Sequence, residues 1–134
     1  MTTVTTIEGI GDAMARKLKN VGIGSTEELL DVCCDQEGRS RIADEARIDE
    51  KKLLRLVNHA DLMRIDGIGG EFAELLEAAG VDSVPELAQR NAESLAAKME
   101  ELNEVKKLVR RVPSSKQLAP WIEEAGGLGK KVTH

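Results

Sequence analysis

A short sequence that occurs twice constrains this chain more than any other feature. Residues 7–11 read Ile-Glu-Gly-Ile-Gly, and 58 positions later residues 65–69 read Ile-Asp-Gly-Ile-Gly. The same offset pairs the residues that follow, which are Ala15, Leu18, Gly22, Ser25 and Leu29 in the first copy and Ala73, Leu76, Gly80, Ser83 and Leu87 in the second. A gapless match of this length, with glycines at fixed places, indicates an internal duplication. The chain must therefore fold in a way that uses the same unit twice.

Apolar residues recur every three or four positions along both copies, which predicts helices. Glycine follows the first helix of each copy, at Gly22 and Gly80, where helices commonly end. Ser25 with Glu28 has the spacing of a capping box. We expect an all-α fold with helices over residues 12–21, 26–33, 36–46, 50–63 and 71–79, then one opening at Pro85, one capped by Asn91 and a last one around residues 118–125.

The last helix is related to the fourth by a second offset, of 65 residues. Leu53, Leu56, Val57 and Ala60 correspond to Leu118, Trp121, Ile122 and Ala125. Only six residues precede Ile7, too few for a helix that completes the first turn. We therefore expect the last helix to return and pack beside Ile10 and the first helix. Two duplicated units would then form one compact, pseudo-two-fold helical domain.

The duplication divides the chain into a first repeat over residues 1–64, a second repeat over residues 65–127 and a flexible tail over residues 128–134. Residues 1–6 are short and polar, so we expect them to be loosely held. Pro120 removes a backbone hydrogen bond within the last helix, which should bend there or begin near Ala119. The pair Gly126-Gly127 should end that helix.

Charge and aromatic content narrow the kinds of ligand. The net charge of -5 has the wrong sign for a protein whose whole surface coats nucleic acid. The charges are uneven, because residues 65–104 carry ten acidic and two basic residues, whereas residues 105–134 carry two acidic and seven basic residues. Phe72 and Trp121 are the only large rings, so we do not expect a platform that stacks single-stranded bases.

Cysteines and apolar segments indicate the compartment. No apolar run approaches the roughly 20 residues that cross a bilayer, and no secretory leader is recognisable, so we expect a cytoplasmic protein without membrane contact. Cys33 and Cys34 are adjacent and no second pair accompanies them, which argues against a disulfide between them and against a zinc site. We expect reduced thiols, at least one of them buried at the end of a helix.

The turns carry a family resemblance. Gly67-Ile68-Gly69, with a predicted helix on either side, resembles the helix-hairpin-helix turn, and each repeat resembles the small helical N-terminal domain of RecA-family recombinases. Over nearly its full length the chain resembles an uncharacterised family of small bacterial proteins built from tandem helix-hairpin-helix units. The resemblance implies backbone N–H groups at a helix N-terminus that bind a nucleic-acid phosphate without reading base edges.

The side chains after the two turns differ in charge. Arg16, Lys17 and Lys19 follow the first turn, whereas Glu71, Glu74 and Glu77 follow the second and would repel a phosphate. We therefore predict non-sequence-specific binding of a DNA or RNA backbone, with the sites Gly9, Ile10, Gly11, Arg16, Lys17 and Lys19. We interpret the second turn, Gly67, Ile68 and Gly69, as structural.

Other interpretations stay open at this point. The acidic second repeat could serve as an interaction scaffold for a basic partner or a second copy, with both turns purely structural. We expect no enzyme, no cofactor and no metal. His59 has no activating neighbour that identifies a base, and Glu100, Glu101 and Glu104 lack the pattern of a calcium loop. The glycine pairs do not complete a nucleotide-binding fingerprint.

Overall fold

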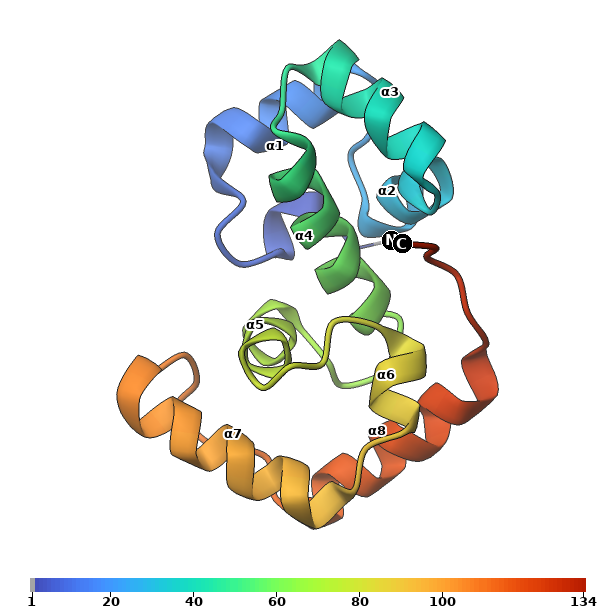
Figure 1. Cartoon of the computed structure of the whole chain (residues 1–134). Coiled ribbons are helices and arrows are strands. Elements are labelled where there is room, and N and C mark those ends of the chain that lie inside the picture. Colours follow the sequence, from blue (N-terminus) through green and yellow to red (C-terminus); the bar gives the residue numbers. More distant parts are fainter. Residues whose placement is uncertain (1) are drawn as a thin grey trace. The chain divides into compact units, whose positions relative to one another are not determined.

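A computed structural model describes residues 2–134 of the chain and shows an all-α protein, as predicted (Figure 1). The chain divides into two compact units, the first comprising Met1–Asp61 with Lys131–His134 and the second Leu62–Lys130. The first unit holds η1 (Val4–Thr6), α1 (Gly11–Asn20), α2 (Thr26–Cys33), α3 (Gln36–Ala46) and nearly all of α4 (Glu50–Leu62). The second holds α5 (Gly70–Ala78), α6 (Val84–Ala88), α7 (Ala92–Lys106) and α8 (Ser115–Leu128).

The sequence pattern predicted most helix ends well. The helices expected over residues 26–33 and 36–46 have the predicted ends, and those expected over residues 12–21, 50–63 and 71–79 differ by one residue. Ser25, Ser83 and Asn91 each accept a hydrogen bond from a backbone N–H of the helix that they precede. Local capping chemistry therefore sets these boundaries.

Backbone hydrogen bonds of the first copy recur in the second at the same offset of 58. One pair lies directly before the glycine turn, one pair ends the helix that follows the turn, and one pair caps the next helix. The pairs are Ile7 N to Val4 O (3.1 Å) and Ile65 N to Leu62 O (3.2 Å), Ile23 N to Leu18 O and Val81 N to Leu76 O (both 2.9 Å), and Glu28 N to Ser25 Oγ (3.1 Å) and Glu86 N to Ser83 Oγ (3.2 Å). The two copies therefore fold alike over this stretch. The pseudo-two-fold relation of the repeats stays a prediction.

The N-terminal residues are fixed, which corrects the expectation of a loose lead-in. Val4 is buried, its N–H donates to Gly24 O at 3.1 Å, and Thr26 N donates to Thr2 O at 2.8 Å. Val4 precedes its turn at the same distance as Leu62 precedes the second turn. A single turn of 3₁₀-helix with one buried valine thus takes the place of a full helix before the first turn.

The last helix packs within its own unit, against α6 and α7. Trp121 lies against the second turn and contacts the ring of Phe72, with ring centroids 5.4 Å apart. In the first unit α4 brings Arg55 beside Gly9. A side chain from the fourth helix of the same unit therefore lies beside the first glycine of each turn, and the packing of the last helix beside Ile10 stays a prediction.

The ends of α8 also differ from the predicted ones. Ser114 and Gln117 form a reciprocal capping box that starts the helix at Ser115, so Pro120 lies inside it. Gly126 and Gly127 remain helical, and Gly129 with φ +74° ends the helix. The proline has no N–H, so one carbonyl of the previous turn of α8 lacks its helical donor.

The segment expected to be a flexible tail is docked. Residues 131–134 belong to the first unit, and Val132 is 2% exposed. Thr133 N donates to Cys34 O at 2.8 Å. No periodic pattern predicts this contact, because the segment is extended and too short to show one. Among the described residues, no helix has the length and apolar character to span a membrane.

Gly38 in α3 provides a test of the packing of the first unit. A Cβ at this position would fall on the carbonyl oxygen of Val32 and within 3.0 Å of Asp35 Oδ1. We predict that Gly38→Ala lowers the free energy of unfolding by about 1–3 kcal/mol, although alanine is the better helix former. Gly126→Ala in α8, where the added methyl has no atom within 4 Å, is the control and should raise stability by about 0.5–1 kcal/mol. Urea unfolding of both variants measures this, and equal effects would contradict the close contact at Gly38.

Candidate nucleic-acid interface

The first turn presents an open helix start. Ile10 is buried and its N–H points back to Ile7 O at 3.4 Å, while Gly9 and Gly11 are exposed. Both glycines have positive φ, +80° and +72°, which other residues rarely adopt. No side chain caps the N-terminus of α1. The first amides of this ten-residue helix therefore lack intrahelical acceptors and carry the positive end of the helix dipole.

A hollow of about 360 Å³ lies along one face of α1, and Gly9, Ile10 and Gly11 are not among the residues that line it. Arg16 and Lys19 line it together, one turn apart, with Asp12 and Ala15 of the same helix also in its wall. The remaining lining residues come from η1 and its flanks and from the link before α2, and they are Thr3, Val4, Thr5 and Gly24. The hollow combines two cations with the two hydroxyls of Thr3 and Thr5, whose oxygens lie 2.9 Å apart.

Lys17 does not join this group. Its Nζ donates to Arg47 O at 3.2 Å, beyond the C-terminus of α3. Arg47 has φ +58° and ends α3 as a left-handed residue, so its carbonyl is free to accept from a side chain. Of the three basic residues predicted for the interface, the structure brings Arg16 and Lys19 together and places Lys17 on a different face.

The second turn shares the positive φ of its first glycine and the buried isoleucine with the first turn, but its surroundings differ. Gly67 has φ +97° and Ile68 is buried, as in the first turn. The N–H of Asp66, however, donates to the Glu124 carboxylate at 3.3 Å. A Cβ on Gly67 would stand 2.9 Å from Trp121 Nε1, so the indole lies directly on the turn. An internal carboxylate and an aromatic ring thus occupy the space that an external phosphate would need.

The twin turns differ also at their second glycine. Gly11 has φ +72° and opens α1, whereas Gly69 is extended with φ -94° and α5 begins one residue later, at Gly70. The expectation that both turns fold alike is therefore right for the first glycine and the isoleucine and wrong for the second glycine. Of the two second glycines, Gly11 and Gly69, only Gly11 adopts the left-handed conformation.

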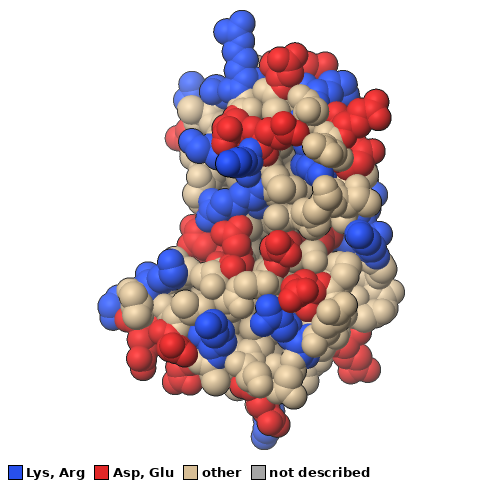
Figure 2. Space-filling model, in the orientation of Figure 1, with Lys and Arg blue, Asp and Glu red and all other residues tan. Residues whose placement is uncertain are grey.

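Several basic residues elsewhere lie close to acidic ones. On the face drawn in Figure 2, Lys and Arg side chains alternate with Asp and Glu side chains. In the first unit Lys131 pairs with Asp31, with Nζ and Oδ1 3.1 Å apart. The candidate interface of the first unit is therefore local, with Arg16 and Lys19 in the hollow and Arg55 beside Gly9 as its basic side chains.

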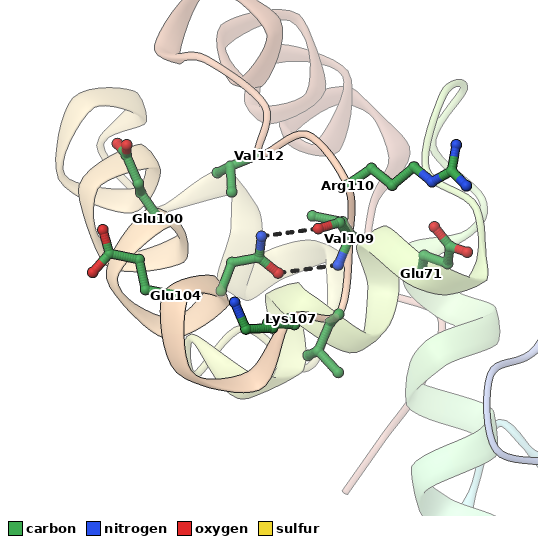
Figure 3. A pocket seen from close by; sticks show the side chains of 9 residues that line it. Glu71, Glu100, Glu104, Lys107, Val109, Arg110 and Val112 are labelled. Atoms are coloured by element: carbon green, nitrogen blue, oxygen red, sulfur yellow. Dashed lines mark hydrogen bonds between the residues drawn. The ribbon is translucent and has the colours of Figure 1, made fainter.

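Lys107 and Arg110 line a separate hollow of about 580 Å³ in the second unit (Figure 3). Its wall carries three carboxylates as well, from Glu71, Glu100 and Glu104. Figure 3 shows Glu100 and Glu104 on one side and Arg110 with Glu71 on the other. The mixture of charges makes this hollow a poor phosphate site.

Asn103 shapes that hollow. Its amide nitrogen donates to Val109 O at 2.9 Å and its amide oxygen accepts from Val109 N at 3.0 Å, as the dashed lines in Figure 3 show. This pairing fixes the loop after α7, where Lys107 has φ +51°.

Among the described residues, no group of three or more His, Cys, Asp or Glu side chains is placed to hold a metal ion.

Several residues whose side chains could take part in chemistry are buried. His59 and Asp61 on α4 are completely buried. Cys33 and Cys34 are free thiols, and Cys33 is buried at the end of α2, as predicted. Sequence reasoning missed Thr3, Thr5 and Glu124, because their roles depend on contacts distant in sequence that no local pattern signals.

Comparison with known proteins identifies a family and no activity. Residues 8–128 match the model of a family described as a domain of unknown function (DUF4332). Comparison with curated proteins and with solved structures gave no match. The family match agrees with the expected resemblance to an uncharacterised family. The helix-hairpin-helix and recombinase resemblances stay predictions.

Burial of the Cys33 thiol should make the stability of the fold depend on pH. Burial raises its pKa from 9.0 to about 11, while Arg39 and Arg41 act in the opposite direction. The folded chain keeps this thiol neutral where the unfolded chain ionises it, so its stabilising effect is full below pH 9 and is lost as the pH rises towards 11. We predict that unfolding stability falls over this range more steeply in the wild type than in Cys33→Ala, measured by urea unfolding at each pH. Equal slopes would show that Cys33 ionises as easily folded as unfolded.

Proposed function

We propose that this chain, which belongs to the DUF4332 family, binds the phosphate backbone of nucleic acid through its first unit. One observation carries the proposal: Arg16 and Lys19 line a single hollow along the helix whose uncapped N-terminus follows the glycine turn. Cations and open backbone amides on one helix are the groups that bind phosphate oxygens. Gly9 and Gly11 lack side chains, so a backbone can approach the turn closely.

The chemistry of the site determines what kind of binding is expected. Amides and lysine or arginine side chains contact phosphates and carry no base information, so we expect binding without sequence preference. Asp12 shares the wall of the hollow and lowers the local positive potential. With two cations in the hollow the affinity should be modest and strongly salt-dependent. Lys17 then contributes only at long range.

The second turn supports the proposal by contrast. Its Asp66 amide already has the carboxylate of Glu124 as an acceptor, and Trp121 covers Gly67. A phosphate there would have to displace a charged group of the same sign and an aromatic ring. We therefore place nucleic-acid binding at the first turn alone.

Charge reversal at the hollow tests this function. We predict that Arg16→Glu with Lys19→Glu weakens duplex DNA binding at least tenfold at low salt, because two phosphate contacts become repulsive. The slope of log K against log salt should fall by about 2. Fluorescence anisotropy of a labelled duplex across a salt series measures both quantities.

The matched control reverses two exposed charges of the same unit outside the hollow, Arg41→Glu with Lys52→Glu. It changes the net charge equally, so a site-specific role predicts a much smaller loss. Equal losses in both double variants would reduce the effect to overall charge. Absence of wild-type binding at low salt would remove the proposal.

A second candidate function is a protein interaction through the second unit. The specific observation is Val105, which is 83% exposed on α7 and directly follows Glu104. Glu100 and Glu104 line the hollow beside it. Val105 stands between Glu104 and Lys106, and Glu100 and Glu101 precede them on α7, so the acidic side of this helix end suits a partner with basic and apolar side chains.

Val105 allows a direct test of that candidate. We predict that Val105→Asp leaves the free energy of unfolding within about 0.5 kcal/mol of the wild type, because the side chain contacts solvent. The same change should reduce capture of a basic partner or of a second copy, measured by cross-linking and sedimentation. A chain that is monomeric and captures nothing, with or without the substitution, would count against a scaffold role.

A further inference from the structure

The segment Lys131–His134 lies in the first unit as an extended ligand lies in a groove. The groove is formed by the end of α2, the start of α3 and the middle of α4. Val132 is buried, and the segment on either side of it makes polar contacts with these three helices. The segment is short and extended, so it depends on the groove for its conformation.

The groove binds both backbone groups of Thr133, the N–H and the C=O. The Thr133 N–H donates to Cys34 O at 2.8 Å, and Arg39 Nη2 donates to Thr133 O at 2.7 Å. Arg39 is 3% exposed, and its Nη1 donates to Cys33 O at 3.1 Å, which fixes the guanidinium. A buried, oriented arginine that reaches the backbone of a distant segment is a built recognition element. Backbone pairing of this kind does not by itself select a side chain.

Side-chain contacts of the segment give the groove its selectivity. Lys131 pairs with Asp31 at 3.1 Å at the rim, and the side chain of the next residue, Val132, is buried. Thr133 Oγ1 donates to Cys34 O at 3.4 Å, and His134 Nε2 lies 2.8 Å from Asn58 Oδ1. The preferred ligand is therefore an extended peptide that carries a basic residue, then an aliphatic residue, then a residue whose side chain can donate a hydrogen bond.

The chain just before the segment is held by Arg64, whose Nη1 donates to Gly129 O at 3.3 Å and whose Nη2 donates to Leu128 O at 3.2 Å. The segment can leave the groove without breaking these contacts, because it begins two residues after Gly129. Residues 131–134 follow the end of α8, so their release breaks none of the helical hydrogen bonds. A further hollow of about 240 Å³, lined by Gln36, Arg39, Glu50, Lys51, Leu54 and His134, continues past the end of the bound segment.

We propose that this groove is a peptide-binding site for extended basic–aliphatic segments of another chain, and that Lys131–His134 is its resident, displaceable ligand. The groove uses Asp31, Arg39 and Asn58, none of which lines the hollow of the nucleic-acid proposal. Tethering gives the resident segment an effective concentration of about millimolar, so a competing peptide must overcome that advantage. Release of the segment is therefore what controls access.

The experiment vacates the groove in the chain of 134 residues. Val132→Asp places a charge at a buried position and should release the segment, and a labelled peptide Gly-Lys-Lys-Val-Thr-His then serves as the probe. We expect the peptide to bind the Val132→Asp chain at least tenfold more tightly than the wild type in fluorescence anisotropy. The same peptide with aspartate for valine should lose at least tenfold in affinity. If Val132→Asp loses the helical circular dichroism of the wild type, Val132→Ser is used instead.

A charge exchange at the rim separates recognition from general attraction. Asp31→Lys in the Val132→Asp background should weaken binding of the lysine peptide several-fold and favour a peptide with glutamate at the position of Lys131. Asp31 is exposed, so this change should leave the fold intact. No binding to a folded, vacated chain at millimolar peptide would overturn the proposal. Equal binding of a scrambled peptide, or no exchange of preference, would overturn it too.

Discussion

The buried isoleucine of each glycine turn is the contact on which the rest of each unit depends. Its N–H closes the turn onto the carbonyl of the isoleucine three residues earlier, at 3.4 Å for Ile10 and 3.1 Å for Ile68, and its side chain enters the core. The preceding glycine adopts positive φ so that the chain can reverse over so few residues. The helix after the turn is thereby aimed along the core, and its amides are left facing outward.

The two copies keep this backbone and differ in what surrounds it. In the first unit an uncapped helix start is followed by Arg16 and Lys19. In the second, Glu124 accepts from the Asp66 amide and Trp121 covers Gly67. Backbone geometry alone therefore does not decide whether a glycine turn can take an anion. The carboxylates and rings that the rest of the unit brings to the turn decide it.

Features set by neighbouring residues were predictable from the sequence. Helices 26–33 and 36–46 and the serine caps follow from apolar spacing and capping chemistry, which act within a few residues. The packing of α8 against α6 and α7 depends on contacts distant in sequence, which helical periodicity does not specify. Buried Val4 likewise stands before the first turn with no helical pattern to indicate it.

The candidate site was predictable only in part, for a similar reason. Charges on α1 are visible in the sequence, but their division between two faces depends on the register of the helix against its neighbours. Lys17 reaches a carbonyl after α3, and Glu124 reaches a turn 58 residues earlier. The docked segment at residues 131–134 is held by the backbone carbonyl of Cys34 and by Arg39, two contacts that leave no sequence signature.

An amide chemical-shift titration of the isotope-labelled chain with a short DNA duplex at low salt tests the central claim most directly. The claim is that two turns of one backbone fold differ in anion binding because of their surroundings. We predict shift changes concentrated at Gly9, Gly11 and the first turn of α1, with the amides of Asp66 to Gly69 unchanged. Changes of equal size at both turns, or changes at the second turn alone, would contradict it.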